Sequence, residues 1–155
     1  MITRRLWTAA VFVGLVSATA LAQTTDPLVG TWKLNAAKSK GTTFKGGTTI
    51  VEAAGAGVKF TVDLMGADGS TAKWSFTANY DGKDNPVTGN SPYGDTVALT
   101  RVDARTIRIA SKQGGKPTVT QTIVVSSDGK TRTTTTKGTS AKGEPVEAMS
   151  FYEKQ

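Results

Sequence analysis

The side chains able to do chemistry in this chain are few, because two residue types that carry much of protein chemistry are missing. The 155 residues include no Cys and no His. Without Cys there is no thiol nucleophile, disulfide scaffold or Cys-based metal site, and without His the commonest general base and transition-metal ligand is absent. Catalysis would have to rely on Asp, Glu, Lys and Tyr.

Three carboxylates, Asp81, Asp84 and Asp95, lie in the segment 81–95, DGKDNPVTGNSPYGD. Paired carboxylates can act as acid and base, as in glycoside hydrolysis, but no recognisable acid–base or nucleophile motif surrounds these. The spacing in DGKDN also departs from that of a calcium loop, and Asp-Gly pairs are typical of turns. We therefore predict no metal, no cofactor and no enzyme, and an active site built on Asp84 or Asp95 is the weakest alternative.

Positive charge is in moderate excess, with 19 Lys and Arg against 12 Asp and Glu and a formal net charge of +7. Beyond the N-terminal segment the positive residues occur singly, as at Lys59 and Lys116, and form no dense block. Nucleic-acid binding requires a clustered basic stripe interleaved with exposed aromatic residues. We expect no nucleic-acid partner.

The N-terminus has the pattern of an export signal. Arg4 and Arg5 precede the apolar run 6–16 (LWTAAVFVGLV), and Ala20-Leu21-Ala22 offers small residues for cleavage. The run is about half of the roughly 20 residues that cross a bilayer. We predict a Sec-type signal peptide over 1–22, cleaved after Ala22, with the rest periplasmic or secreted and not inserted in a membrane. A retained anchor is the alternative.

After Ala22 the hydrophobic pattern has a period of two, which is typical of half-buried strands. The clearest case is 57–65, where Val58, Phe60, Val62 and Leu64 alternate with polar residues. Turn dipeptides such as Asp128-Gly129 separate the runs. The pattern predicts nine strands, over 28–35, 47–54, 57–65, 71–80, 95–102, 105–112, 117–126, 130–137 and 146–153.

These strands predict one all-β domain over 23–155. Strands joined by short turns form an antiparallel meander, and closure into an up-and-down barrel of about 8–9 strands buries every apolar face without exposing long edges. A two-sheet sandwich is the alternative. The longest irregular stretch is 81–95, and long loops in compact domains are often functional.

The two ends of the predicted domain resemble a known group of barrels. Gly30-Thr31-Trp32-Lys33-Leu34-Asn35 resembles the G-x-W opening strand of lipocalins and fatty-acid-binding proteins, the calycins, and of small secreted bacterial proteins with a lipocalin-like domain. Phe151-Tyr152-Glu153-Lys154 resembles the last strand of fatty-acid-binding proteins. The resemblance implies a barrel plugged at one end by Trp32, with a ligand cavity at the other.

The chain also departs from these families. Fatty-acid-binding proteins carry an R-x-Y pair that holds a ligand carboxylate, and here Tyr152 matches the Tyr whereas Ser150 stands in place of the Arg. Lipocalins stack an Arg on the opening Trp. Arg132 and Lys154 are both candidates for that position.

Together these features predict non-covalent binding of a small apolar or amphipathic molecule inside the barrel. The expected walls are Phe60, Trp74, Phe76 and Tyr80, and a barrel of this size either holds one small ligand or is filled by side chains. Arg101 and Tyr152 are the expected polar contacts, although Arg101 at a strand end could equally sit at the rim. The alternative is an interaction module with a filled barrel, and the oligomeric state stays open.

Overall fold

The computed structural model describes residues 25–155 and contains eleven strands, most of which show the period-two pattern. The predicted signal peptide lies outside this range. Within residues 25–155 no helix has the length and apolarity to cross a membrane. The strands are β1 (Gly30–Lys40), β2 (Phe44–Ala54), β3 (Gly57–Gly66), β4 (Thr71–Asn79), β5 (Asp81–Pro86), β6 (Thr88–Gly89), β7 (Thr96–Asp103), β8 (Thr106–Gln113), β9 (Lys116–Val125), β10 (Thr131–Thr139) and β11 (Pro145–Lys154).

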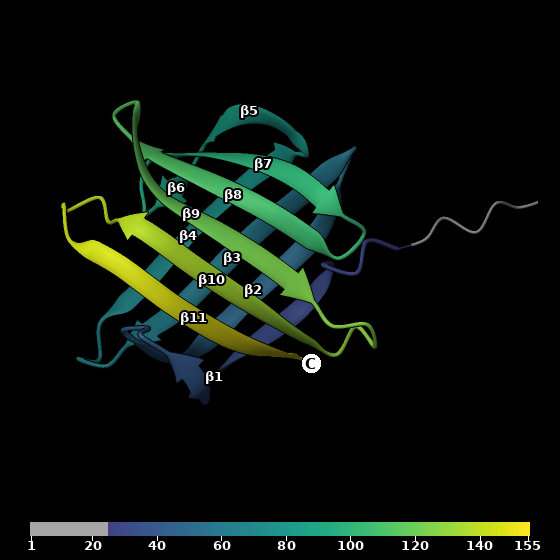
Figure 1. Ribbon diagram of the computed structural model, residues 1–155, viewed down its shortest axis with the longest axis horizontal. Helices are drawn as coiled ribbons and strands as arrows, with labels where there is room; N and C mark the ends of the chain where they lie inside the picture. Colours follow the sequence, from purple (N-terminus) through teal and green to yellow (C-terminus); the bar gives the residue numbers. More distant parts are fainter. Residues whose placement is uncertain (1–24) are drawn as a thin grey trace, which may run out of the picture.

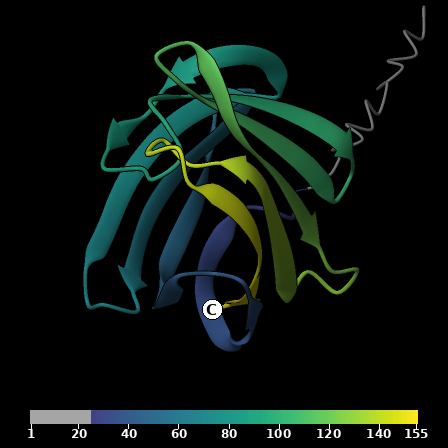
Figure 2. The ribbon, with the colours of Figure 1, turned by 60° about the vertical axis from the view of Figure 1, so that its left-hand side comes forward.

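All eleven strands belong to one antiparallel sheet, in the order β5-β7-β8-β9-β10-β11-β1-β2-β3-β4-β6. The last strand pairs with the first, because β11 lies between β10 and β1 with Tyr152 opposite both Arg132 and Leu34. In Figure 1 the strands β7 to β11 cross in front of β2 to β4, and Figure 2 shows the sheet curling round between the two groups.

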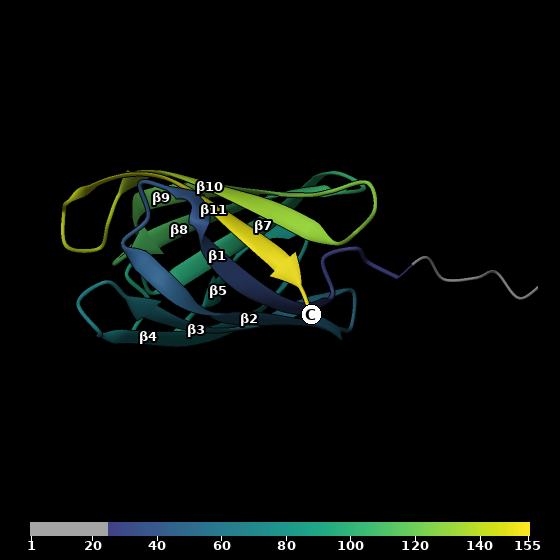
Figure 3. The same cartoon turned by 90° about the horizontal axis from the view of Figure 1, so that it is seen from below.

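The sheet forms a nearly closed barrel, which is flattened so that two walls face each other (Figure 3). The prediction of an all-β antiparallel barrel is therefore confirmed. The architecture is consistent with a calycin-like fold. A sandwich of two separate sheets is not what forms, because β11 and β1 join both walls into one hydrogen-bonded sheet.

The strand number is higher than the predicted eight to nine, and the two extra strands lie in the segment that was expected to be irregular. β5 pairs with β7, and β6 pairs with β4, so both occupy the edges of the sheet. Edge strands tolerate Pro and Gly. Because the segment 81–95 is rich in both, its sequence does not show the alternation that would predict strands. Gly89 approaches β4 so closely that a Cβ atom would lie 2.3 Å from the Lys73 carbonyl oxygen.

Alternation places one face of each long strand in the barrel interior. On β3 the predicted apolar face is confirmed, since Val58, Phe60, Val62 and Leu64 are all buried while Lys59 between them is exposed. The interior is not uniformly apolar, however. On β10 the three inward residues are Arg132, Thr134 and Thr136, and all of them are buried.

The barrel has two different ends. At one, which we call the closed end, Trp32 is fully buried and its Nε1–H donates a hydrogen bond of 2.8 Å to the carbonyl of Leu28, itself buried. At the other, the mouth, the turns 41–43, 67–70, 114–115 and 140–144 lie close to the segment 87–95. A ligand that reaches the interior from the mouth would meet the closed end last.

Candidate ligand site in the barrel interior

A cavity lies inside the barrel between the two walls. It is a hollow of about 480 Å³ including its opening, of which about 40 Å³ is free for water-sized molecules. About 10–15 Å³ of such space holds one water, so the free part has room for a few waters only. Of the six predicted ligand residues, the structure brings four together on this cavity: Phe60, Trp74, Phe76 and Tyr152.

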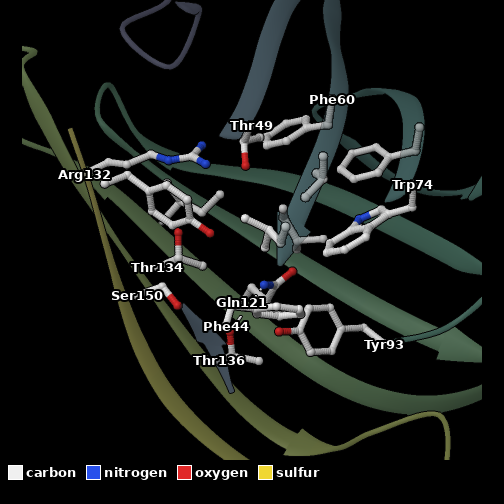
Figure 4. A pocket seen from close by; sticks show the side chains of 16 residues that line it. Phe44, Thr49, Phe60, Trp74, Tyr93, Gln121, Arg132, Thr134, Thr136 and Ser150 are labelled. Atoms are coloured by element: carbon white, nitrogen blue, oxygen red, sulfur yellow. Dashed lines mark hydrogen bonds between the residues drawn. The ribbon is translucent and has the colours of Figure 1, made fainter. Parts of the chain in front are cut away.

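The cavity has an apolar side and a polar side, as Figure 4 shows. The rings of Phe60 and Phe76 stack with centroids 4.8 Å apart and planes 18° from parallel. They pack beside Val62 and Leu64 on β3 and Trp74 on β4. The polar side is made by side chains from β9, β10 and β11, namely Gln121, Arg132, Thr134, Thr136, Ser150 and Tyr152, whereas Thr49 lies beside Val62 on the other wall.

Arg132 is the most unusual residue of the interior. Its side chain is buried, with 3% of the residue exposed, and its Nε and Nη1 atoms have no hydrogen-bond partner among residues 25–155. No ion pair forms between it and a carboxylate of that range. Burial lowers the pKa of Arg132 to about 10, against the effect of nearby Tyr152, so the guanidinium keeps its charge at neutral pH.

Two aromatic rings hold this guanidinium in place. Its Cζ atom lies 4.5 Å from the ring centroid of Tyr152 and 5.1 Å from that of Trp32. The ammonium of Lys154 is also 5.1 Å from the Trp32 ring, so both predicted candidates for a cation beside Trp32 occupy that position. Cation–π contacts stabilise a cation only partly and supply no hydrogen-bond acceptor.

Arg132 also lies beside Tyr152, although Ser150 and not an Arg precedes Tyr152 by two residues on its own strand. Cross-strand register places Arg132 directly opposite Tyr152, and Thr134 opposite Ser150. The structure thus places an arginine and a tyrosine from two adjacent strands side by side. Burial raises the pKa of the Tyr152 phenol, which Arg132 and Thr49 oppose, so the hydroxyl is a neutral donor at physiological pH.

The mouth is crossed by residues 87–95, which we call the strap. It is bonded to β4 through the Asn90 amide and the Lys73 carbonyl, 2.9 Å apart, and on the other side through the Asp95 amide and the Lys112 carbonyl, also 2.9 Å apart. The hydroxyl of Thr118 donates to the carbonyl of Tyr93. The strap is therefore attached to both walls.

Tyr93 points from the strap into the cavity (Figure 4). Its ring packs edge-on against Trp74, with centroids 6.1 Å apart and planes at 89°. Burial raises the pKa of Tyr93 to about 12, and the proximity of Tyr152 adds to this while Thr136 opposes it. The ring fills space that a ligand would otherwise use.

The other two predicted ligand residues, Tyr80 and Arg101, lie at the closed end and do not line the cavity. The Cζ atom of Arg101 is 4.0 Å from the Tyr80 ring centroid, and both side chains bond one oxygen of Asp26, Tyr80 at 2.6 Å and Arg101 at 2.5 Å. Arg101 thus occupies the rim position that was one of its two expected placements.

The carboxylates of 81–95 have structural partners. Asp84 pairs with the Lys112 ammonium at 2.7 Å, Asp95 accepts the Gly114 amide at 3.1 Å, and Asp81 accepts the Lys83 amide at 3.0 Å. Across residues 25–155 no three Asp or Glu side chains gather in a way that could hold a metal ion.

Sequence reasoning missed Arg132 and Tyr93 as cavity residues. Arg132 stands in TRTTTTKGT, where both faces of the strand are polar, so alternation could not show which side points inward. The sequence offered Arg132 only as one of two candidates for the cation beside Trp32. Tyr93 lies in a segment with two Pro and three Gly, where no period exists.

Comparison with known sequences assigns no family to this chain. A scan against protein-family models and a search of curated protein sequences found no match to this chain. Its function must therefore be inferred from the geometry of the interior.

Proposed function

We propose that this protein is a lipocalin-like carrier, not an enzyme, that holds a small amphipathic molecule with an anionic group inside its barrel. The anion, a carboxylate or a group of similar charge, binds Arg132 and the Tyr152 hydroxyl, and the apolar part lies against Phe60, Phe76 and Trp74. Export to the periplasm or beyond is part of the proposal and rests on the pattern of residues 1–22.

One observation carries the proposal: Arg132 is a buried cation with two unpartnered donors facing a cavity. Removing an ion from water without a counter-charge costs several kcal/mol. Buried charges are therefore normally paired. Charge-assisted hydrogen bonds to a carboxylate are about twice as strong as neutral ones. An anionic ligand group would supply the missing partner.

The opposite wall fits the remainder of such a molecule. The stacked rings of Phe60 and Phe76 give a continuous apolar surface on which a ligand could exclude water. The free space of about 40 Å³ is too small for it while Tyr93 is inserted, because pockets for small molecules usually measure about 300–1,000 Å³. Binding therefore includes displacement of the Tyr93 ring from the mouth.

The small free volume also favours a second candidate, an interaction module whose barrel is filled. In that case a few waters satisfy Arg132, and the protein acts through its outer surface. This alternative predicts that no amphipathic anion binds the interior.

A matched pair of ligands separates the two candidates. Calorimetry with decanoate and with decan-1-ol compares the same apolar chain with and without a charge. We expect the wild type to bind decanoate at least about 30-fold more tightly, since an unpaired buried charge changes binding by about 2–5 kcal/mol. The Arg132→Met variant should lose this preference, and Arg132→Lys should keep part of it because the charge remains.

Arg101→Met is the control, because it removes an aromatic-stacked guanidinium that does not line the cavity. Its preference for decanoate should equal that of the wild type. Absence of binding by either ligand, or a preference that survives Arg132→Met in a variant with a cooperative melting transition, would reject the carrier and favour the filled barrel.

A further inference from the structure

Polar side chains continue along the interior beyond Arg132 in an ordered way. Register places Thr134 opposite Ser150, and the next inward residue of the strand, Thr136, opposite Gln121. Adjacent inward positions on a strand are about 6.6 Å apart. The hydrogen-bonding side chains thus form a row of cross-strand pairs on one wall. The row starts at the Arg132–Tyr152 pair near the closed end and continues toward the mouth.

Some of these side chains lack good hydrogen-bond partners within the protein. The Thr134 Oγ1 atom is buried and has no hydrogen-bond partner among residues 25–155. The contact from the Gln121 Nε2 atom to Thr136 Oγ1 is 3.3 Å, longer than the usual range for such bonds. A buried hydroxyl without a partner is unfavourable. Val has nearly the same shape as Thr and would fill that position without this penalty.

The facing wall is different in kind. Phe60, Phe76 and Val62 offer rings and methyl groups but no hydrogen-bonding side-chain atom, and the polar groups on this wall are the Trp74 indole N–H and the Thr49 hydroxyl. A ligand between the walls therefore meets a series of donors and acceptors on one flank and a mainly apolar surface on the other. A plain alkyl chain would cover the polar wall and leave Thr134 unpartnered.

We propose that the ligand carries hydroxyl or amide groups along one flank, beyond its anionic end, and that Thr134, Ser150 and Gln121 bind them. The inference rests on the proposed function, since it describes the same interior site. It narrows the ligand class from any amphipathic anion to an oxygen- or nitrogen-substituted one that is apolar on its other flank.

The test combines one substitution in the protein with one in the ligand. Decanoate is compared by calorimetry with decanoates that carry a single hydroxyl at carbon 3, 5 or 7. We expect at least one of these to bind the wild type about 10-fold more tightly than decanoate, the effect of one well-placed hydrogen bond. In Thr134→Val this preference should fall below about 2-fold, whereas decanoate itself should bind unchanged.

Thr133→Val is the matched control, because Thr133 is the preceding residue of the same strand and points to the outer face. It should keep the preference. Thr134→Val should also be at least as stable as the wild type in urea, since it removes an unpartnered buried hydroxyl.

The outcomes separate the two proposals. Equal binding of decanoate and all three hydroxylated forms, or a preference that Thr134→Val retains, would overturn the polar-flank inference and leave the anion site standing. If decanoate and its derivatives all fail to bind, the proposed function itself is rejected, and the further inference with it.

Discussion

The molecule contains the same local arrangement twice, an arginine stacked on a tyrosine, with opposite electrostatic outcomes. At the closed end Arg101 lies over Tyr80, and Asp26 accepts hydrogen bonds from both. In the interior Arg132 lies over Tyr152, more deeply buried, and no carboxylate of residues 25–155 reaches it. The first pair has its anion within the chain and the second does not.

This difference indicates what each pair does. The Asp26–Tyr80–Arg101 cluster attaches the segment that precedes β1 to the ends of β4 and β7, where Asp26 also accepts the Leu28 amide at 3.0 Å. It is complete and structural. The interior pair offers the same donors without the acceptor, so an external carboxylate placed as Asp26 is placed would complete it.

The largest expected effect is on stability, where the two arginines should differ in sign. Arg101→Met removes a partly buried ion pair and should lower the free energy of unfolding by about 1–2 kcal/mol, less than a fully buried pair because solvent screens it. Arg132→Met replaces an unpaired buried charge by an apolar side chain and should be neutral or raise it by about 1–2 kcal/mol. Urea unfolding of the two variants measures both values.

A clear loss of stability in Arg132→Met without ligand would contradict the comparison. It would mean that Arg132 is satisfied within the protein, for example by buried water, and contributes to the fold as Arg101 does.

Alkaline pH provides a second test, because burial raises the pKa of all three tyrosines, Tyr80, Tyr93 and Tyr152. Each phenol binds its proton more tightly in the folded than in the unfolded state. Their contribution to stability is therefore complete below about pH 10, the ordinary tyrosine value, and is lost as pH rises above it. The lowered pKa of Arg132 changes stability with pH in the opposite direction. It is one group against three tyrosines, so we expect a net loss of stability at alkaline pH.

Ultraviolet absorbance measures the ionisation of the tyrosines directly. The native protein should show little tyrosinate between pH 10 and 11, whereas the protein in urea should titrate near pH 10. If one tyrosine titrates near pH 10 in the native protein, that ring is exposed, and the closure of the mouth by Tyr93 or the burial of one of the two pairs is wrong.

The smallest expected effect concerns one tyrosine only. Burial raises the pKa of Tyr80, and the hydrogen bond to Asp26 and its negative charge raise it further. In Asp26→Asn the charge is lost, while Arg101 remains, so the pKa of Tyr80 should fall and those of Tyr93 and Tyr152 should not change. Absorbance titration of the variant should show one of three tyrosines ionising at lower pH, and an unchanged curve would disprove this coupling.

Much of the barrel could be predicted from the sequence, because the alternation of apolar and polar residues along the chain indicates strands. The run from Val58 to Leu64 shows the period of two clearly, and all its apolar residues are buried as expected. The segment 81–95 could not be predicted, since β5 and β6 form only by pairing with β7 and β4, and their Pro and Gly residues hide that pairing.

The candidate site was predicted in part for the same reason. Phe60, Trp74 and Phe76 belong to alternating apolar faces, and such faces must point inward in a barrel. Tyr80 and Arg101 follow the same alternation, but they lie at strand ends beside Asp26, a residue 54 positions before Tyr80. No local pattern contains that distant partner.

Local pattern alone is enough to specify the strand type, the inward apolar faces and the burial of Trp32, because each depends on neighbouring residues. The placement of Arg132 depends on β10 lying between β9 and β11, and the Arg132–Tyr152 pair depends on the register of two strands joined by a turn. Which arginine obtains a carboxylate and which stays unpaired is decided by contacts between distant segments. Only the folded barrel brings those segments together.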